Sequence, residues 1–380
     1  PKGNVPNLRF PEFQGEWEKC KLGELTTKVG SGSTPKGGNA VYTSVGHCFV
    51  RSQNVGMGYL ILDDIAHIDD DIHQKHKATE LSEDDVLLNI TGASIGRTAI
   101  ATKEIEGGNV NQHVCIIRAN SKVSPKFLCN YIQTKKIQNY IRSLQTGGSR
   151  EGLNFDQIRS FPISLPSIAE QNKIAQLLDK LNERIATQNK IIDKLQSLIK
   201  GIAQHCIREL INGWEYVRLG DICKITTGKL DANAQVENGQ YPFFTCAERP
   251  FNIDSYAFDT EALLISGNGA NLGYINYYKG KFNAYQRTYV LDHFSVNIQY
   301  VKWALKVLLP QRIAIEKSSS NTPYIVLSTL ADLKIPIPNN SKQNLIADLM
   351  MSFERKLSTQ LVLSDLYNKQ KQYLLRQMFI

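Results

Sequence analysis

The sequence predicts an α+β protein in which two globular units of mixed α/β structure are separated by two long helices. Three observations predict this fold: a long apolar heptad seam in the middle of the chain, a similar seam at its end, and motifs that recur in the same order before each seam. The chain is therefore interpreted as an internal duplication. We expect the helices to pair as an antiparallel coiled coil, because the intervening unit must return the chain to the start of the second helix.

The first long helix is predicted over residues 167–212. Its start is marked by Pro166 and Ser167, with Glu170 three residues after the serine, as in an N-terminal capping box. A helix of this length would extend for about 69 Å, which indicates a spacer. Nine of the ten seam positions are apolar, and they alternate in steps of four and three: Ile174, Leu178, Leu181, Ile185, Gln188, Ile192, Leu195, Ile199, Ile202 and Cys206.

The repeat is visible as matched motifs in the two halves of the chain. The matched pairs are residues 17–25 with 214–222, 86–96 with 262–273, Gln112 with Gln286, and Gln171 with Gln343. Their separation falls from 197 to 172 residues, so the second half is shorter by 25 residues, 20 of which are lost between about Gly38 and Glu83. The predicted segments are a globular unit over 1–166, a helix over 167–212, a second unit over 213–338 and a second helix over 339–380. The alternative is that each helix packs only on its own globular unit.

A second apolar line runs beside the first seam at Leu177, Ile191 and Leu198. A two-stranded coil does not need these side chains, so either a globular unit or another protein is expected to cover them. They are the candidate partner-binding residues.

Composition limits the function classes. A chain of 380 residues is long enough for two or three domains, and its net charge of +8 suits a phosphate-bearing partner, although ordinary surface lysines explain it equally well. Seven cysteines without a C-x-x-C pair favour reduced thiols and argue against a structural zinc site, so no metal ligand is assigned. Without a signal peptide or an apolar run of about 18 residues, the expected location is cytoplasmic, with no membrane contact.

The loops of both globular units are polar and rich in small residues. Arg, Gln and Asn can bond base edges, and Gly- and Ser-rich loops let backbone N–H groups approach phosphates. Each cluster alone is equally typical of a solvated turn, but related units that carry such clusters at matching places favour DNA binding. The candidate DNA-binding residues are Ser31, Ser33, Thr34, Lys36, Arg51, Gln53, Asn54, Ser94, Arg97, Ser149, Arg150, Thr227, Lys229, Arg249, Asn268, Asn271, Arg287, Lys317, Ser319 and Asn321.

No catalytic motif is found. Gly228-Lys229 and Gly280-Lys281 lack the spacing and the Ser or Thr of a phosphate-binding P-loop. Residues 321–324 approach the Asn-Pro-Pro-aromatic motif of an amino-methyltransferase, but Thr322 replaces a proline and no glycine-rich cofactor turn precedes them. The chain is therefore expected to be no enzyme.

Several of these segments together resemble the specificity subunit of type I restriction-modification systems. They are PNLRFPEFQGEW at residues 6–17, LGE at 22–24, RSQN at 51–54 and ISLPSIAEQ at 163–171. The resemblance covers essentially the whole chain, and the doubled order of motifs is specific to that family. The second half departs from it with Ser341-Lys342 where the first has Ala169-Glu170.

The resemblance implies that each globular unit is a target recognition domain that reads one half of a bipartite double-stranded DNA site. It implies that the paired helices set the spacer and dock the modification subunits. The partners would be two modification subunits and two restriction subunits, and S-adenosylmethionine, ATP and Mg would be held by those partners rather than by this chain. The rival interpretations are a self-contained DNA methyltransferase and a purely structural coiled-coil adaptor.

Overall fold

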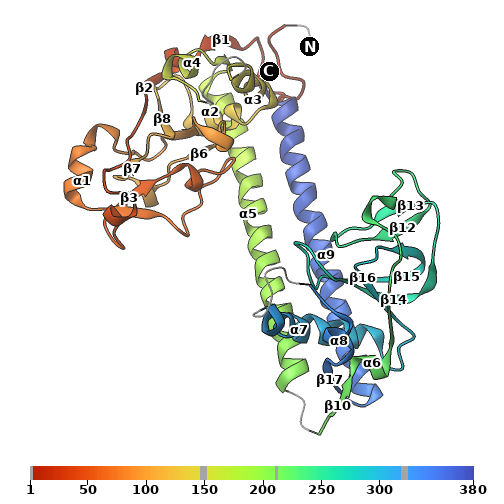
Figure 1. The fold of residues 1–380 in the computed structure, drawn as a ribbon. Helices are drawn as coiled ribbons and strands as arrows, with labels where there is room; N and C mark the ends of the chain where they lie inside the picture. Colours follow the sequence, from red (N-terminus) through yellow and green to blue (C-terminus); the bar gives the residue numbers. More distant parts are fainter. Residues whose placement is uncertain (1–2, 146–151, 210–212, 318–323) are drawn as a thin grey trace. The chain divides into compact units, whose positions relative to one another are not determined.

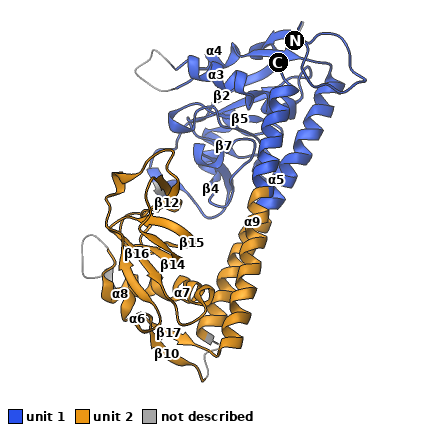
Figure 2. Cartoon of the chain, turned by 90° about the vertical axis from the view of Figure 1, so that its right-hand side faces the viewer, with its two compact units in different colours: residues 1–189, 363–380 blue, residues 190–362 orange. Residues whose placement is uncertain are grey.

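The computed structural model describes residues 3–145, 152–209, 213–317 and 324–380. The chain forms two compact units, residues 1–189 with 363–380 and residues 190–362 (Figure 2). The boundaries between them fall inside the two longest helices, α5 (Ile168–Gln204) and α9 (Asn340–Gln377). Each unit therefore contains part of both helices, and the units do not coincide with the four predicted segments.

Both long helices begin close to where the sequence predicts. The first ends earlier, because α5 gives way after Gln204 to a π-helical turn at His205–Glu209. Its 37 residues correspond to about 56 Å rather than about 69 Å. The second helix is capped by Asn339, whose Oδ1 accepts a hydrogen bond from the Lys342 N–H at 3.0 Å.

The helices pair in antiparallel fashion within each unit. In the first unit the early part of α5 lies beside the last part of α9 (Figure 1), and Ile174 and Leu375 belong to one hydrophobic core. In the second unit the late part of α5 lies with the early part of α9, and Ile199 and Met350 share a core. The predicted antiparallel coiled coil is thus confirmed, and the alternative that each helix packs only on its own globular unit is wrong.

The first unit contains three small sheets. A two-stranded antiparallel sheet pairs β1 (Glu18–Lys21) with β9 (Pro162–Leu165). An antiparallel sheet of order β2-β8-β5-β6 consists of β2 (Thr26–Ser31), β8 (Val114–Ala119), β5 (Val86–Asn89) and β6 (Thr98–Ile100). A mixed sheet of order β4-β3-β7 consists of β4 (Ala66–Ile68), β3 (His47–Val50) and β7 (Asn109–Val110). Besides its parts of α5 and α9, the described residues of this unit form the helices α1 (Asp70–Lys75), α2 (Pro125–Ile132), α3 (Lys135–Ser143) and α4 (Phe155–Arg159).

The second unit repeats this plan with one change. The pair of β10 (Glu215–Arg218) and β17 (Lys334–Ile337) matches β1 and β9. Its main sheet, of order β11-β16-β14-β15-β12-β13, contains β11 (Lys224–Thr227), β16 (Thr288–Asp292), β14 (Phe258–Ser266), β15 (Ile275–Ala284), β12 (Tyr241–Phe244) and β13 (Phe251–Ile253). Besides its parts of α5 and α9, the described residues of this unit form the helices α6 (Leu219–Ile222), α7 (Ile298–Lys317) and α8 (Leu327–Ala331). The single long strand β15 takes the places of both β6 and β7. Because β15 pairs with β14 and with β12, the second unit has one continuous sheet where the first unit has two separate sheets. The internal duplication is confirmed.

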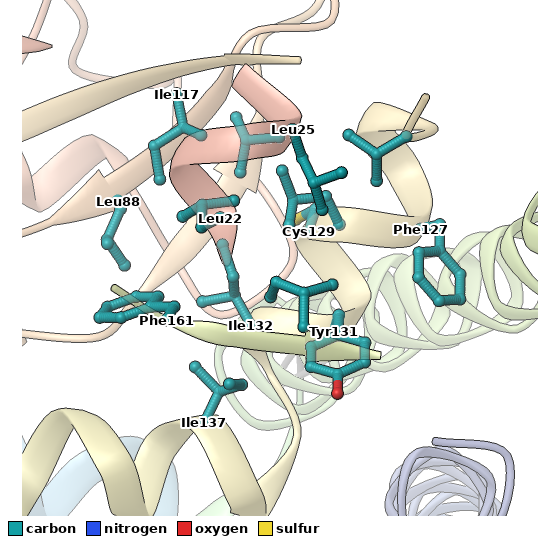
Figure 3. Close-up of a cluster of buried hydrophobic side chains, with 14 of the residues drawn as sticks. Leu22, Leu25, Leu88, Ile117, Phe127, Cys129, Tyr131, Ile132, Ile137 and Phe161 are labelled. Atoms are coloured by element: carbon teal, nitrogen blue, oxygen red, sulfur yellow. The ribbon is translucent and has the colours of Figure 1, made fainter. Parts of the chain in front are cut away.

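The core of the first unit joins its globular part to the long helices. Figure 3 shows Phe127 and Tyr131 of α2 among the buried side chains of this cluster. The Phe379 ring lies 5.2 Å from that of Phe127 and 6.5 Å from that of Trp17, so the end of the chain packs into this core. The Tyr131 hydroxyl donates to the backbone oxygen of Ile380 at 2.6 Å.

Equivalent glutamines bind the first turn of each long helix to a globular part, that of α5 in the first unit and that of α9 in the second. In the first unit Gln171 Oε1 accepts from the Ser124 N–H at 2.8 Å, while its Nε2 donates to the Pro166 oxygen at 2.9 Å. In the second unit Gln343 Oε1 accepts from the Asn297 N–H at 3.0 Å, while its Nε2 donates to the Pro338 oxygen at 2.8 Å. Both side chains are buried, at 0% and 2% exposed. We call these two residues the glutamine clamps.

An ion-pair cluster joins α7 to α9 in the second unit. Glu354 of α9 accepts from Lys302 Nζ at 2.7 Å and from Lys306 Nζ at 3.0 Å, both on α7. Burial alone would raise the pKa of Glu354, but the two lysines outweigh it and hold the pKa below its ordinary value of 4.5. The unfolded chain therefore binds this proton more readily, so the stabilisation is complete above the ordinary pKa and is lost as pH falls through the lowered one.

We expect the free energy of unfolding of the second unit to decrease less steeply below about pH 5 in Glu354→Gln than in wild type. Urea unfolding at several pH values checks this, with the exposed α9 residue Asp348→Asn as the matched control. An equal acid dependence in wild type and Glu354→Gln would contradict the role of this cluster.

Candidate nucleic-acid interface

Three loops of the first unit meet at one polar edge: the loop after β2, the β5–β6 loop and the β7–β8 turn. Thr34 of the first loop donates its hydroxyl to Gln112 Oε1 of the turn. Gln112 Nε2 lies 3.1 Å from His113 Nε2, and because an amide nitrogen donates, that ring nitrogen accepts. The proton then sits on His113 Nδ1, which faces the Thr91 hydroxyl at 2.5 Å. One hydrogen-bonded chain thus ties the three loops together.

The second unit builds the same edge with different side chains. Gln286 is the counterpart of Gln112, and its Nε2 donates to Asp231 Oδ1 at 2.7 Å in the loop after β11. The next residue, Arg287, is exposed where the first unit has His113. In the β14–β15 loop, Asn271 Nδ2 donates to the Cys246 oxygen at 3.0 Å.

Backbone hydrogen bonds establish that these edges are equivalent. The Ile90 N–H donates to the His113 oxygen at 3.0 Å, and the Gly267 N–H donates to the Arg287 oxygen at 2.8 Å. His113 and Arg287 therefore occupy the same position in the two units.

Glycines let the first loop of each edge pass close to a strand end. A Cβ at Gly32 would lie 1.7 Å from the Val110 oxygen, and one at Gly228 would lie 1.9 Å from the Ala284 oxygen. Any other residue at either position would collide with backbone, so the route of the loop depends on glycine.

The RSQN segment lies beside the edge of the first unit but is turned partly inward. Asn54 is fully buried, with its Oδ1 accepting from the Arg51 N–H and its Nδ2 donating to the Ile61 oxygen, both at 2.9 Å. Gln53 Nε2 donates to Asp64 Oδ2 at 2.8 Å, and Arg51 donates to the Asp64 backbone oxygen at 3.0 Å. In this structure Asn54 supports the loop and does not present its amide to a ligand, whereas Gln53 remains exposed.

The other predicted DNA-binding residues divide by exposure. Exposed side chains are Ser33, Thr34, Lys36 and Arg97 in the first unit and Thr227, Lys229, Arg249 and Arg287 in the second. Half-buried ones are Ser31, Arg51, Ser94, Asn268 and Asn271. Ser149, Arg150, Ser319 and Asn321, with the side chain of Lys317, lie outside the described residues. DNA contact by any of them stays a prediction.

Sequence reasoning did not select the residues that tie the edges together, namely Thr91, Gln112, His113, Asp231 and Gln286. A signal was present, since Gln112 and Gln286 are matched in the repeat. Their hydrogen bonds to distant loops became apparent only from the folded chain.

Among the described residues, no group of three or more His, Cys, Asp and Glu side chains is arranged to hold a metal ion. Burial raises the pKa of the Cys115 thiol to about 12 and that of Cys129 to about 11, which disfavours reactive thiolates. No described helix combines the length and the apolar character needed to cross a membrane.

Comparison with known proteins agrees with this architecture. The family model of the type I restriction modification DNA specificity domain matches residues 14–197 and 211–362. The EcoDI type I restriction enzyme specificity subunit of Escherichia coli is 45% identical over 135 residues, 36% of this chain and 30% of that protein. The MjaIX specificity subunit of Methanocaldococcus jannaschii is 25% identical over 291 residues, 66% of this chain and 67% of that protein.

A solved structure shows the same fold. The S subunit of a type I restriction-modification system from M. genitalium superposes with a TM-score of 0.69 and covers 99% of both chains at 17% sequence identity. At that identity the likeness concerns the fold alone. The family match, which extends over both halves of the chain, shows that this protein belongs to the family of type I restriction-modification specificity subunits.

Proposed function

We propose that each globular unit reads one half of a bipartite DNA target through its polar edge, and that the chain itself catalyses no reaction. The observation that carries this proposal is the equivalence of the two edges. The same three loops recur around Gln112 and Gln286, but His113 in one edge is replaced by Arg287 in the other. Two units that recognise different DNA sequences need the same backbone arrangement with different side chains facing the bases.

The partners follow from the same proposal. Double-stranded DNA would lie on the polar edges, while two modification subunits would transfer methyl groups from S-adenosylmethionine. Two restriction subunits would use ATP and Mg to translocate and cut DNA. The relatives' names, which describe them as specificity subunits of type I restriction enzymes, support this assignment.

The long helices would set the spacing between half-sites and dock the modification subunits. Leu177, Ile191 and Leu198 of α5 are 36%, 43% and 51% exposed, so their apolar surface is available for docking. Their substitution by polar residues would then weaken assembly without changing the bases read.

We expect Arg287→Ala to relax recognition at one or two positions of a single half-site, with a loss of about 1–3 kcal/mol of discrimination. Arginine bonds guanine edges bidentately, and this one is exposed at the edge of the second unit only. Genome-wide mapping of methylated sites in cells that carry the variant checks this. Arg218→Ala, an exposed arginine of β10, is the matched control and should leave both half-sites intact. Equal relaxation of both half-sites, or of neither, would contradict the proposal.

A further inference from the structure

A pocket of about 470 Å³ opens in the second unit among α5, its π-helical extension, α7 and α9. Its lining includes the cationic residues Lys200, Lys306 and Arg208, the aromatic Trp303, and the apolar Ala203 and Leu357. Every lining residue belongs to this unit, and none of them is acidic.

The equivalent place in the first unit is occupied by the chain itself. Gln133 of the first unit corresponds to Lys306 of the second, because each lies nine residues after the residue whose N–H bonds the glutamine clamp. Lys371 of the first unit corresponds to Ile199 of the second, because the two are separated by the repeat offset of 172 residues. A Cβ at Gly58 would lie 2.6 Å from Gln133 Oε1 and 2.9 Å from Lys371 Nζ. The β3–β4 loop that carries Gly58 therefore rests against the positions that line the pocket in the second unit.

The second unit lacks the corresponding length of loop. Fifteen residues, 51–65, connect β3 to β4, whereas six residues, 245–250, connect the equivalent strands β12 and β13. This difference is part of the shortening seen in the repeat. It accounts for an open pocket where the first unit has a loop.

The pocket carries positive charge and no acidic lining residue, while Arg208 Nη2 donates to the backbone oxygen of Val307 at 3.3 Å. Trp303 Nε1 and Arg208 Nε are buried donors with no hydrogen-bond acceptor among the described residues. Trp303 is 5% exposed, and the Lys306 ammonium lies 4.2 Å from the centre of its ring. Lys306 is partly balanced by Glu354, while Lys200 is exposed at the rim. An occupant that matches this lining would supply carboxylate oxygens near Lys200 and apolar atoms that cover Leu357.

These properties favour a peptide over nucleic acid. A concave, half-apolar pocket of this size encloses a few side chains, whereas a duplex presents a broad and fully charged surface. We infer that the pocket is a docking site for an acidic, partly apolar segment of a modification subunit, an inference that rests on the proposed function. The two modification subunits would then meet unlike surfaces, one closed by the Gly58 loop and one open.

Lys200→Glu tests this inference, because the side chain is exposed and its reversal should leave the fold intact. Binding of the purified modification subunits to the full chain is measured by calorimetry and native mass spectrometry. We expect the affinity for one of the two to fall roughly tenfold or more, so that complexes with a single modification subunit accumulate. Lys194→Glu, an exposed lysine on the same helix outside the pocket, is the matched control and should bind as wild type.

Two results would overturn the inference. One is Lys200→Glu behaving like Lys194→Glu in assembly. The other is normal assembly combined with weakened DNA binding, which would assign the pocket to DNA. Failure of the wild-type chain to bind modification subunits would instead refute the proposed function and is distinguishable from both.

A photo-crosslinker at Gln204, an exposed lining residue, gives a direct measurement of docking. We expect a crosslinked acidic peptide from the modification subunit, and crosslinks only within this chain would contradict docking.

Discussion

Replacing the clamp residue Gln171 with leucine is expected to lower the free energy of unfolding of the first unit by about 2–4 kcal/mol. The side chain is fully buried, so leucine would leave the Ser124 N–H and the Pro166 oxygen without their partner. A third bond, from Gln171 Nε2 to the Lys122 oxygen at 3.1 Å, would also be lost. Each buried polar group that loses its hydrogen-bond partner lowers the free energy of unfolding by about 1–3 kcal/mol. The burial of the apolar leucine side chain offsets only part of that loss.

The functional consequence of the clamp concerns spacing. Because Gln171 fixes the start of α5 to the residue before α2, its loss should let the globular part of the first unit shift relative to α5. Under the proposed function, the variant would methylate sites with altered spacers while the half-site sequences stay the same. Urea unfolding and methylation mapping measure the two effects separately.

The matched control for the clamp is Gln176→Leu, an exposed glutamine five residues further along the same helix. It should change neither stability nor spacing. Gln343→Leu should reproduce the effect in the second unit, because the clamp is equivalent there. A Gln171→Leu chain with lowered stability but an unchanged spacer would show that the clamp is structural only.

The long helices and the duplication could be predicted because their signals are periodic. A heptad seam from Ile174 to Ile199 specifies a helix and an apolar stripe without reference to the rest of the fold. The end of α5 is less predictable, since a π-helical turn after Gln204 follows from local packing rather than from periodicity. Likewise, one long β15 in place of separate β6 and β7 is set by pairing with distant strands.

The candidate interface was harder to predict, because loop side chains take their direction from contacts far along the chain. Asn54 has the chemistry to read a base, but the carbonyl of Ile61 and the N–H of Arg51 hold its amide inside the protein. The repeat matches Gln112 with Gln286, but its hydrogen bond with Thr34, 78 residues earlier, depends on the folded chain. Residue type indicates which side chains could bind DNA, whereas only the fold determines which of them are free to do so.

The largest functional change is expected from exchanging the reading edge of one unit. Residues 26–119, from β2 to β8, contain the first edge but exclude Gln171, α2 and the contacts of Phe379. Replacing them with the equivalent segment of another specificity subunit should therefore preserve folding and the pairing of the helices. One half-site should become that of the donor.

Mapping of methylated sites in cells that carry this exchanged chain tests the central claim most directly. If each unit reads one half-site and the helices set the distance between them, one half-site changes completely while the other half-site and the spacer length remain those of the parent. A simultaneous change in both half-sites, or an unchanged target in a chain that still assembles and methylates DNA, would contradict it.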